Sequence, residues 1–167
     1  MRVYYTTMIY LIIHDVRSAH NVGSLFRTAD GVGVAKIFLT GYTGAPIDRF
    51  GRKDTKVSKV SLGAEDTVPW EKRDIAELVA ELKKQTVKVV ALEQSPNAVP
   101  LDAYVPTGDV ALVVGNEVGG VPDDVLALCD AVVEIPMRGS KESFNVSVAT
   151  GIALYKLASP TSPPRPF

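Results

Sequence analysis

The chain has 167 residues, of which 46% are hydrophobic and 22% charged, and its net charge is −1 at pH 7. This length and balance indicate one globular domain and exclude wholesale disorder. A single cysteine, Cys129, excludes an intramolecular disulfide and a cysteine-based zinc cluster. His14 and His20 are the only histidines, so we expect no metal site. Because the net charge is near zero, the chain as a whole does not attract nucleic acid by charge.

The first apolar run of the chain extends from Met8 to Ile13 and is far too short to span a bilayer. It also lacks a small-residue cleavage site, so it indicates a strand rather than a signal peptide. We therefore expect a cytoplasmic protein that does not bind a membrane.

Strands and helices alternate along the chain. In chain order the predicted elements are strand 8–13, helix 21–31, strand 36–40, a long polar stretch 41–70, helix 71–85, strand 87–92, strand 109–114, helix 123–128, strand 131–135 and helix 145–157. Asn21 is the expected N-cap of the first helix, and Gly31 or Gly33 its end. The polar stretch 41–70 is long enough to be functional or mobile, and it can hold a short helix that the pattern does not place.

This alternation predicts an α/β fold with a mostly parallel sheet flanked by helices. Residues 1–158 form the domain, and the proline-rich tail 159–167 is expected to be flexible. In such folds ligands bind beyond the carboxyl ends of the strands. Polar or glycine-rich segments follow three of the strands here: 14–21, 115–121 and 136–143. The final helix, 145–157, is apolar on most sides, which indicates burial or contact with a partner chain.

Three short segments could carry chemistry, and each has a purely structural alternative. The first segment, NVGSLFRTA, starts at Asn21 and begins a helix whose N-terminus could bind an anion. In the structural alternative it supplies only a helix cap and a surface arginine, Arg27. The second segment, VGNEVGGVP, contains Glu117 and does not match the glycine-rich motifs that bind nucleotide phosphates. Its structural alternative is an ordinary tight turn between a strand and a helix, but such a turn would not explain Glu117 if that residue is buried. In the third segment Asn145 or Ser143 could simply cap the last helix.

No catalytic triad or metal signature accompanies them. Asp15 and His20 could pair, although ordinary turn contacts explain both residues. The only basic cluster lies between positions 49 and 59, where five cations accompany one acid, Asp54. The cations are Arg49, Arg52, Lys53, Lys56 and Lys59. The cluster is either a solvated loop or a phosphate-contacting one.

Taken together, NVGSLFRTA, VGNEVGGVP and IPMRGSKESFNVSVATGIALY resemble the three motifs of the SpoU/TrmH-like RNA methyltransferases, a branch of the SPOUT superfamily. The resemblance runs from about Leu11 to Leu157 and is most specific in the third motif, whereas 41–106 matches only in layout. It implies methyl transfer from S-adenosylmethionine to a ribose 2′-hydroxyl of tRNA or rRNA. It further implies an α/β knot with a C-terminal trefoil and a homodimer.

The resemblance also assigns residues. Cofactor contacts carry over to Leu92, Gly115, Gly119, Ile135, Pro136, Met137, Phe144 and Asn145. Catalytic roles carry over to Arg27, Asn21, Glu117, Ser143 and Asn145. RNA contacts are expected from Arg27, Arg49, Arg52, Lys53 and Lys56. Because a guanidinium stays protonated, we expect Arg27 to stabilise charge and orient phosphate rather than to act as a base.

Other functions stay open at this point. A non-catalytic RNA-binding or assembly protein could keep the same fold, and a SPOUT enzyme could methylate a base instead of a ribose. A flavodoxin-like small-molecule binder fits the alternation of elements but leaves the third motif unexplained. Only seven residues precede Met8, so we expect no separate N-terminal RNA-binding domain. RNA selection would then come from the dimer surface, from the 49–59 cluster, or from a partner.

Overall fold

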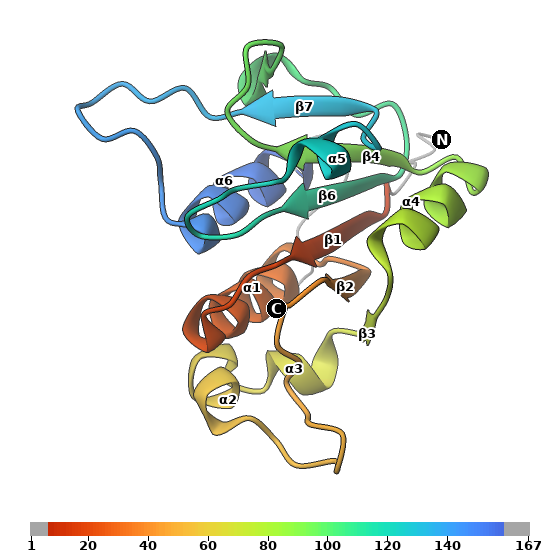
Figure 1. Cartoon of the computed structure of the whole chain (residues 1–167), viewed down its shortest axis with the longest axis vertical. Helices are drawn as coiled ribbons and strands as arrows, with labels where there is room; N and C mark the ends of the chain where they lie inside the picture. Colours follow the sequence, from red (N-terminus) through yellow and green to blue (C-terminus); the bar gives the residue numbers. More distant parts are fainter. Residues whose placement is uncertain (1–6, 159–167) are drawn as a thin grey trace, which may run out of the picture.

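The computed structural model describes residues 7–158, and its centre is a parallel sheet. Seven strands lie in the order β3-β2-β1-β6-β4-β7-β5, and every pairing is parallel (Figure 1). The strands are β1 (Ile9–His14), β2 (Lys36–Thr40), β3 (Trp70–Lys72), β4 (Lys88–Leu92), β5 (Val99–Pro100), β6 (Val110–Val114) and β7 (Ala131–Glu134). The predicted α/β fold is confirmed, with β3 and β5 as additional short edge strands.

Helices cover both faces of the sheet. They are α1 (Ala19–Val32), α2 (Thr55–Ser61), α3 (Ala64–Thr67), α4 (Ile75–Lys84), η1 (Leu101–Ala103), α5 (Asp123–Leu126) and α6 (Val146–Ala158). Leu11 and Ile13 belong to the core cluster that includes α1 and α6, whereas Ile12 and Phe38 belong to the cluster that includes α4 and α5. Because both faces are covered, the central strands are apolar throughout rather than alternating.

The first helix starts two residues earlier than predicted, and its N-cap is not Asn21. Ser18 is the N-cap, and its Oγ accepts a hydrogen bond from the Asn21 amide at 3.2 Å. This leaves the Asn21 side chain available for long-range contacts. The helix ends at Gly33, one of the two predicted ends, where φ is +82° and the amide bonds the carbonyls of Ala29 and Asp30.

The stretch 41–70, predicted as a long polar loop, contains α2 and α3 and leads into β3. Asp54 caps α2 by accepting hydrogen bonds from the amides of Lys56 and Val57. The helix predicted from residue 71 begins only at Ile75, after the N-cap Asp74, because Glu71 lies in β3 and pairs with β2. The pattern missed α2 and α3 because they are too short to show a periodicity.

The C-terminal half follows the prediction more closely. Helix α5 ends at Leu126 rather than at residue 128, and β7 ends one residue before the predicted end at 135. The last helix begins after Asn145, whose Oδ1 accepts from the Ser147 amide at 2.9 Å, so Asn145 is the capping side chain. The predicted tail 159–167 lies outside the described residues. Within residues 7–158, no helix combines the length and apolarity that crossing a membrane requires.

Candidate functional site

A cavity of about 290 Å³ lies at the carboxyl ends of β4, β6 and β7, where parallel sheets bind ligands. The predicted cofactor residues that line it are Leu92, Gly115, Gly119, Ile135, Met137 and Phe144. Two others, Pro136 and Asn145, are not among its lining residues. The loop between β7 and α6 forms one wall, and the Gln94 side chain ties that wall to β4 by donating to the Glu142 carbonyl at 2.7 Å.

The charges around the cavity have one sign. Its lining includes four carboxylates, Glu93, Glu117, Glu134 and Glu142, and neither lysine nor arginine. The remaining side chains of the lining are apolar or uncharged. A cavity of this composition suits a ligand with an apolar part and a positive charge, and it disfavours a phosphate.

The loop after β6 is closed by backbone contacts and by a carboxylate. The amides of Asn116 and Gly120 each bond the other residue's carbonyl, at 3.0 and 2.9 Å. At Gly120 φ is +67°, and a Cβ there would collide with Glu93 Oε2, which accepts from the Val121 amide at 2.8 Å. The loop is therefore a tight turn, and its positive φ favours glycine at position 120.

Glu117 joins this loop to the start of α1. Its carboxylate accepts hydrogen bonds from the Ser18 amide at 3.0 Å, from Asn21 Nδ2 at 3.1 Å and from the Arg17 amide at 3.3 Å. The residue is exposed, so the buried Glu117 considered from the sequence is not what the structure shows. Burial of its carboxyl alone raises the pKa of Glu117, but the hydrogen bonds from Ser18 and Asn21 outweigh it and leave the pKa below its ordinary value.

Asn21 also connects the first and third motifs. Asn145 Nδ2 donates to Asn21 Oδ1 at 3.3 Å, although the two residues are 124 positions apart. Asn145 Oδ1 in turn accepts from the Ser147 hydroxyl at 2.6 Å. Asn21 is buried, so it has little access to solvent and needs these partners. Asn21, Glu117 and Asn145 thus form one hydrogen-bonded chain across the three motifs.

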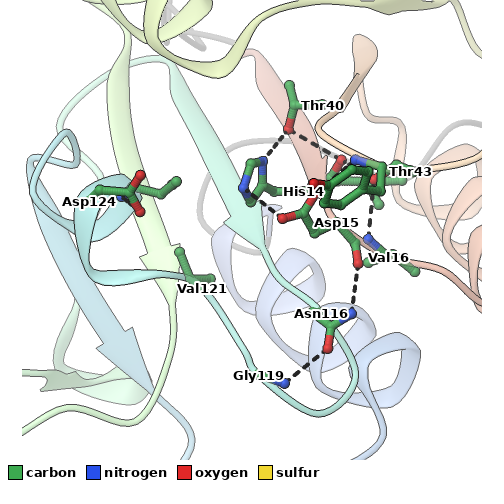
Figure 2. A network of polar contacts seen from close by, with 12 residues as sticks. His14, Asp15, Val16, Thr40, Thr43, Asn116, Gly119, Val121 and Asp124 are labelled. Carbon is green, nitrogen blue, oxygen red and sulfur yellow. Dashed lines mark hydrogen bonds and ion pairs between the residues drawn. The ribbon is translucent and has the colours of Figure 1, made fainter.

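A second polar network, shown in Figure 2, fixes the segment between β1 and α1. The His14 ring lies between Thr40 Oγ1, at 2.8 Å from Nδ1, and the Asp15 carboxylate, at 3.4 Å from Nε2. Asp15 thus pairs with His14 and not with His20. Asp15 adopts a left-handed φ of +55°, and its carbonyl accepts from Asn116 Nδ2 at 2.9 Å. This network holds the amides of residues 17 and 18 where Glu117 binds them.

Two predicted catalytic residues make no such contacts. Ser143 is exposed and lines the cavity. Arg27 is exposed on α1 and is not among the lining residues. Within residues 7–158, no hydrogen bond or ion pair engages the Arg27 guanidinium, so it can contact a bound substrate.

The basic cluster is partly neutralised. Arg52 Nε pairs with Asp48 at 2.8 Å, and Lys53 Nζ pairs with Asp66 at 2.5 Å. Arg49 and Lys56 are exposed, and no carboxylate among residues 7–158 pairs with either. Of the cations predicted to bind RNA in this cluster, these two are therefore the ones left to meet an anionic partner.

The sequence patterns did not identify Glu93, Gln94 or Asn116 as site residues. Glu93 and Asn116 hold the glycine-rich loop, and Gln94 holds the opposite wall. Glu93 directly follows β4, and Asn116 follows β6 after one glycine. Their positions just beyond strand ends, where ligands bind in parallel sheets, are the signal that could have found them.

The sheet and the cavity at its carboxyl edge define an α/β protein with a candidate ligand site, which the three motifs surround. The SpoU rRNA Methylase family model matches residues 8–155, and the chain belongs to that family. Two similar relatives are named 23S rRNA (guanosine-2'-O-)-methyltransferase RlmB. The one from Coxiella burnetii is 34% identical, over 96% of this chain and 62% of the relative. The one from Nitrosomonas europaea is 36% identical, over 87% of this chain and 54% of the relative. The chain thus spans less than two thirds of the length of these relatives.

Solved structures agree with this fold. The A. aeolicus TrmH/SpoU tRNA modifying enzyme superimposes with a TM-score of 0.79 at 29% identity, covering 93% of this chain and 76% of that one. An AdoMet-bound rRNA methyltransferase from Sinorhizobium meliloti gives a TM-score of 0.79 at 27% identity, covering 93% of this chain and 57% of that one.

Proposed function

We propose that the protein transfers a methyl group from S-adenosylmethionine to a ribose 2′-hydroxyl of tRNA or rRNA. The observation that carries this proposal is the hydrogen-bonded chain from Glu117 through Asn21 to Asn145, which joins the three motifs beside the cavity. Family membership and the activity of the named relatives support the same function.

The cavity fits S-adenosylmethionine by its chemistry. Leu92, Ile135 and Phe144 offer apolar contacts to an adenosine, and the backbone around 135–137 would bind the adenine edge. The surrounding carboxylates favour the positive charges of the sulfonium and the amino group. When bound, the cofactor supplies an already activated methyl group, so the protein has mainly to bind and orient the acceptor.

The chain's own residues then act on the RNA. Arg27 stabilises negative charge on the attacking ribose oxygen and orients the neighbouring phosphate, because its guanidinium stays protonated. Ser143 and Asn145 hold the ribose, and Asn145 is positioned by Asn21. Glu117 anchors the loop after β6 to the start of α1. The RNA backbone is contacted by Arg27, Arg49 and Lys56. Arg52 and Lys53, which were also expected to bind RNA, are paired with Asp48 and Asp66.

We further propose that two copies form the working unit. Helix α6 exposes Val148 and Ile152, and the adjacent loop exposes Phe144. An apolar strip beside the cavity is a costly surface for a monomer and a suitable one for an interface between two copies. The proposal includes a C-terminal trefoil knot, a domain over residues 1–158 and a cytoplasmic location. Family membership supports the knot.

Incubation of the protein with unmethylated total tRNA and rRNA and labelled S-adenosylmethionine tests this function. Nuclease digestion and mass spectrometry should then reveal 2′-O-methylated nucleosides. A base-methylated product would make the protein a different SPOUT enzyme. RNA binding without transfer would make it a non-catalytic RNA-binding or assembly protein.

A further inference from the structure

The basic cluster contains a hydrogen-bonded turn with an aromatic residue at its tip. Ile47 and Lys53 form an antiparallel bridge, and Asp48 closes the turn between them. The Asp48 carboxylate accepts from the amides of Phe50 and Arg52 at 2.8 and 2.9 Å and from Arg52 Nε at 2.8 Å. At Gly51 φ is +77°, a conformation that favours glycine. The hydrogen bonds from Arg52 and Phe50 hold the pKa of Asp48 below its ordinary value.

The base of the turn is anchored in the fold. Pro46 is buried, and its carbonyl accepts from the Asp54 amide at 2.8 Å. Thr43 is fully buried, and its hydroxyl donates to the Ile13 carbonyl at 2.8 Å. Lys53 pairs with Asp66 at the other end of the turn. These contacts tie both ends of the turn to the fold and so fix where the turn lies on the surface.

Phe50 occupies this tip with 66% of its surface exposed. The Arg49 and Arg52 guanidinium carbons lie 4.7 and 5.1 Å from its ring centroid. An exposed ring flanked by guanidinium groups is a poor surface for another apolar chain, because burial would desolvate both cations. The same group suits a nucleic acid, whose bases stack on aromatic and guanidinium planes and whose phosphates pair with cations.

The position of the turn also matters. In Figure 1 the orange segment between β2 and α2 reaches the bottom of the molecule, whereas β7 and the loop that follows it lie near the top. This segment thus lies away from β7 and the loop after it, which form part of the cavity. A contact there would hold a substrate at a distance from the reacting ribose.

We propose that Phe50 is a stacking platform for an unpaired nucleobase of the RNA substrate, with Arg49 and Lys56 contacting the adjacent phosphates. This inference rests on the proposed function, because it takes RNA to be the substrate. It adds a specificity element, since a paired base inside a duplex cannot stack on the ring. The enzyme would thereby select RNA that carries a loop or bulge some distance from the target ribose.

Fluorescence anisotropy with two RNA probes tests the proposal: a hairpin with an unpaired loop and a blunt duplex of the same stem sequence. Phe50→Ala should weaken binding of the hairpin by roughly 5- to 100-fold and leave duplex binding unchanged. Phe50→Trp should retain hairpin binding. Arg49→Glu should weaken both probes and lower the salt dependence of binding. Val105→Ala, which alters another exposed apolar side chain, is the matched control and should change neither.

Donor binding, methyl transfer and dimer mass are measured on the same samples. If the wild-type protein binds the hairpin and methylates RNA while Phe50→Ala binds the hairpin equally tightly, the inference is overturned and the proposed function stands. If Phe50→Ala dissociates the dimer by light scattering, Phe50 contacts a second copy and the inference is also overturned. If the wild-type protein neither binds RNA nor transfers a methyl group, the proposed function fails and the inference falls with it.

Discussion

Gly23 gives a sharp test of how α1 packs against α2. A Cβ at this position would lie 2.6 Å from the Val57 carbonyl oxygen, 2.9 Å from Val60 Cβ and 3.2 Å from the Ser61 amide. Two of these atoms belong to the backbone of α2, so no side-chain rotation can relieve the collision. Gly23→Ala must therefore move one helix relative to the other. Overpacking of this kind costs about 2–3 kcal/mol, and the higher helix propensity of alanine returns about 1 kcal/mol.

The net expectation is a loss of about 1–2 kcal/mol in the free energy of unfolding, the difference between those two effects. Gly31→Ala on the same helix is the matched control, since nothing lies within 4 Å of a Cβ built there. That variant should gain about 0.5–1 kcal/mol. Urea denaturation of both variants measures the difference. A Gly23→Ala protein as stable as the Gly31→Ala protein would refute the close approach of α1 and α2.

Three further predictions concern the site and the interface. Glu117→Gln should lower stability at pH 7 by about 1 kcal/mol after allowance for solvent exposure. Because the pKa of Glu117 is lower in the folded state, the ionised carboxylate stabilises the fold at pH values above its unfolded-state pKa, and this stabilisation is lost as the pH falls through its folded-state pKa. The difference in unfolding free energy between wild type and Glu117→Gln, measured by urea titration, should therefore be smaller at pH 3 than at pH 7. An equal difference at both pH values would contradict this. Gly120→Ala should weaken S-adenosylmethionine binding about tenfold or more, because alanine is strained at the positive φ of this position. Calorimetry measures the affinity, and an unchanged value would show that the conformation of Gly120 does not matter for binding the donor. Ile152→Asp should convert a dimer to a monomer in light scattering, whereas a dimer that persists would place the interface elsewhere.

Periodicity predicted the long helices and the buried strands, but not the short elements. Strand 36–40 matches β2 in full, and α6 is shifted by one residue. By contrast, α2 has seven residues and α3 four, fewer than two helical turns each. Their stability comes from packing, as the contact of α2 with Gly23 illustrates. Such tertiary contacts leave no period in the sequence.

Asn21 shows why local rules misplace a residue of the candidate site. Its type and position made it the expected N-cap, but Ser18, also a good capping residue, lies three positions earlier and caps the helix. The Asn21 side chain instead bonds Glu117 and Asn145, which lie 96 and 124 positions away. Contacts over such separations follow from the strand order and cannot be derived from spacing along the chain. The family resemblance pointed to these residues, and the structure adds the bonds that join them.

The supporting residues were harder to anticipate. Glu93 is an ordinary surface acid in the sequence, yet its carboxylate caps the Val121 amide beside Gly120. His14 and Asp15 carry no motif of their own, and their contacts with Thr40 and Asn116 depend on the adjacency of β1, β2 and β6. Positions immediately after the ends of neighbouring parallel strands are therefore the ones to examine first in a chain of this class.

The most direct test of the proposed mechanism is single-turnover methyl transfer by Arg27→Ala, with donor affinity measured by calorimetry on the same preparation. Arg27 does not line the cavity, so donor affinity should stay within about twofold of the wild-type value. Loss of the charge that stabilises the attacking oxygen should slow transfer by roughly 10²- to 10³-fold. Arg27→Lys should recover only part of this rate, because an ammonium cannot make the planar, bidentate contacts of a guanidinium. Near wild-type transfer by Arg27→Ala would contradict the assignment of Arg27 as the charge-stabilising residue.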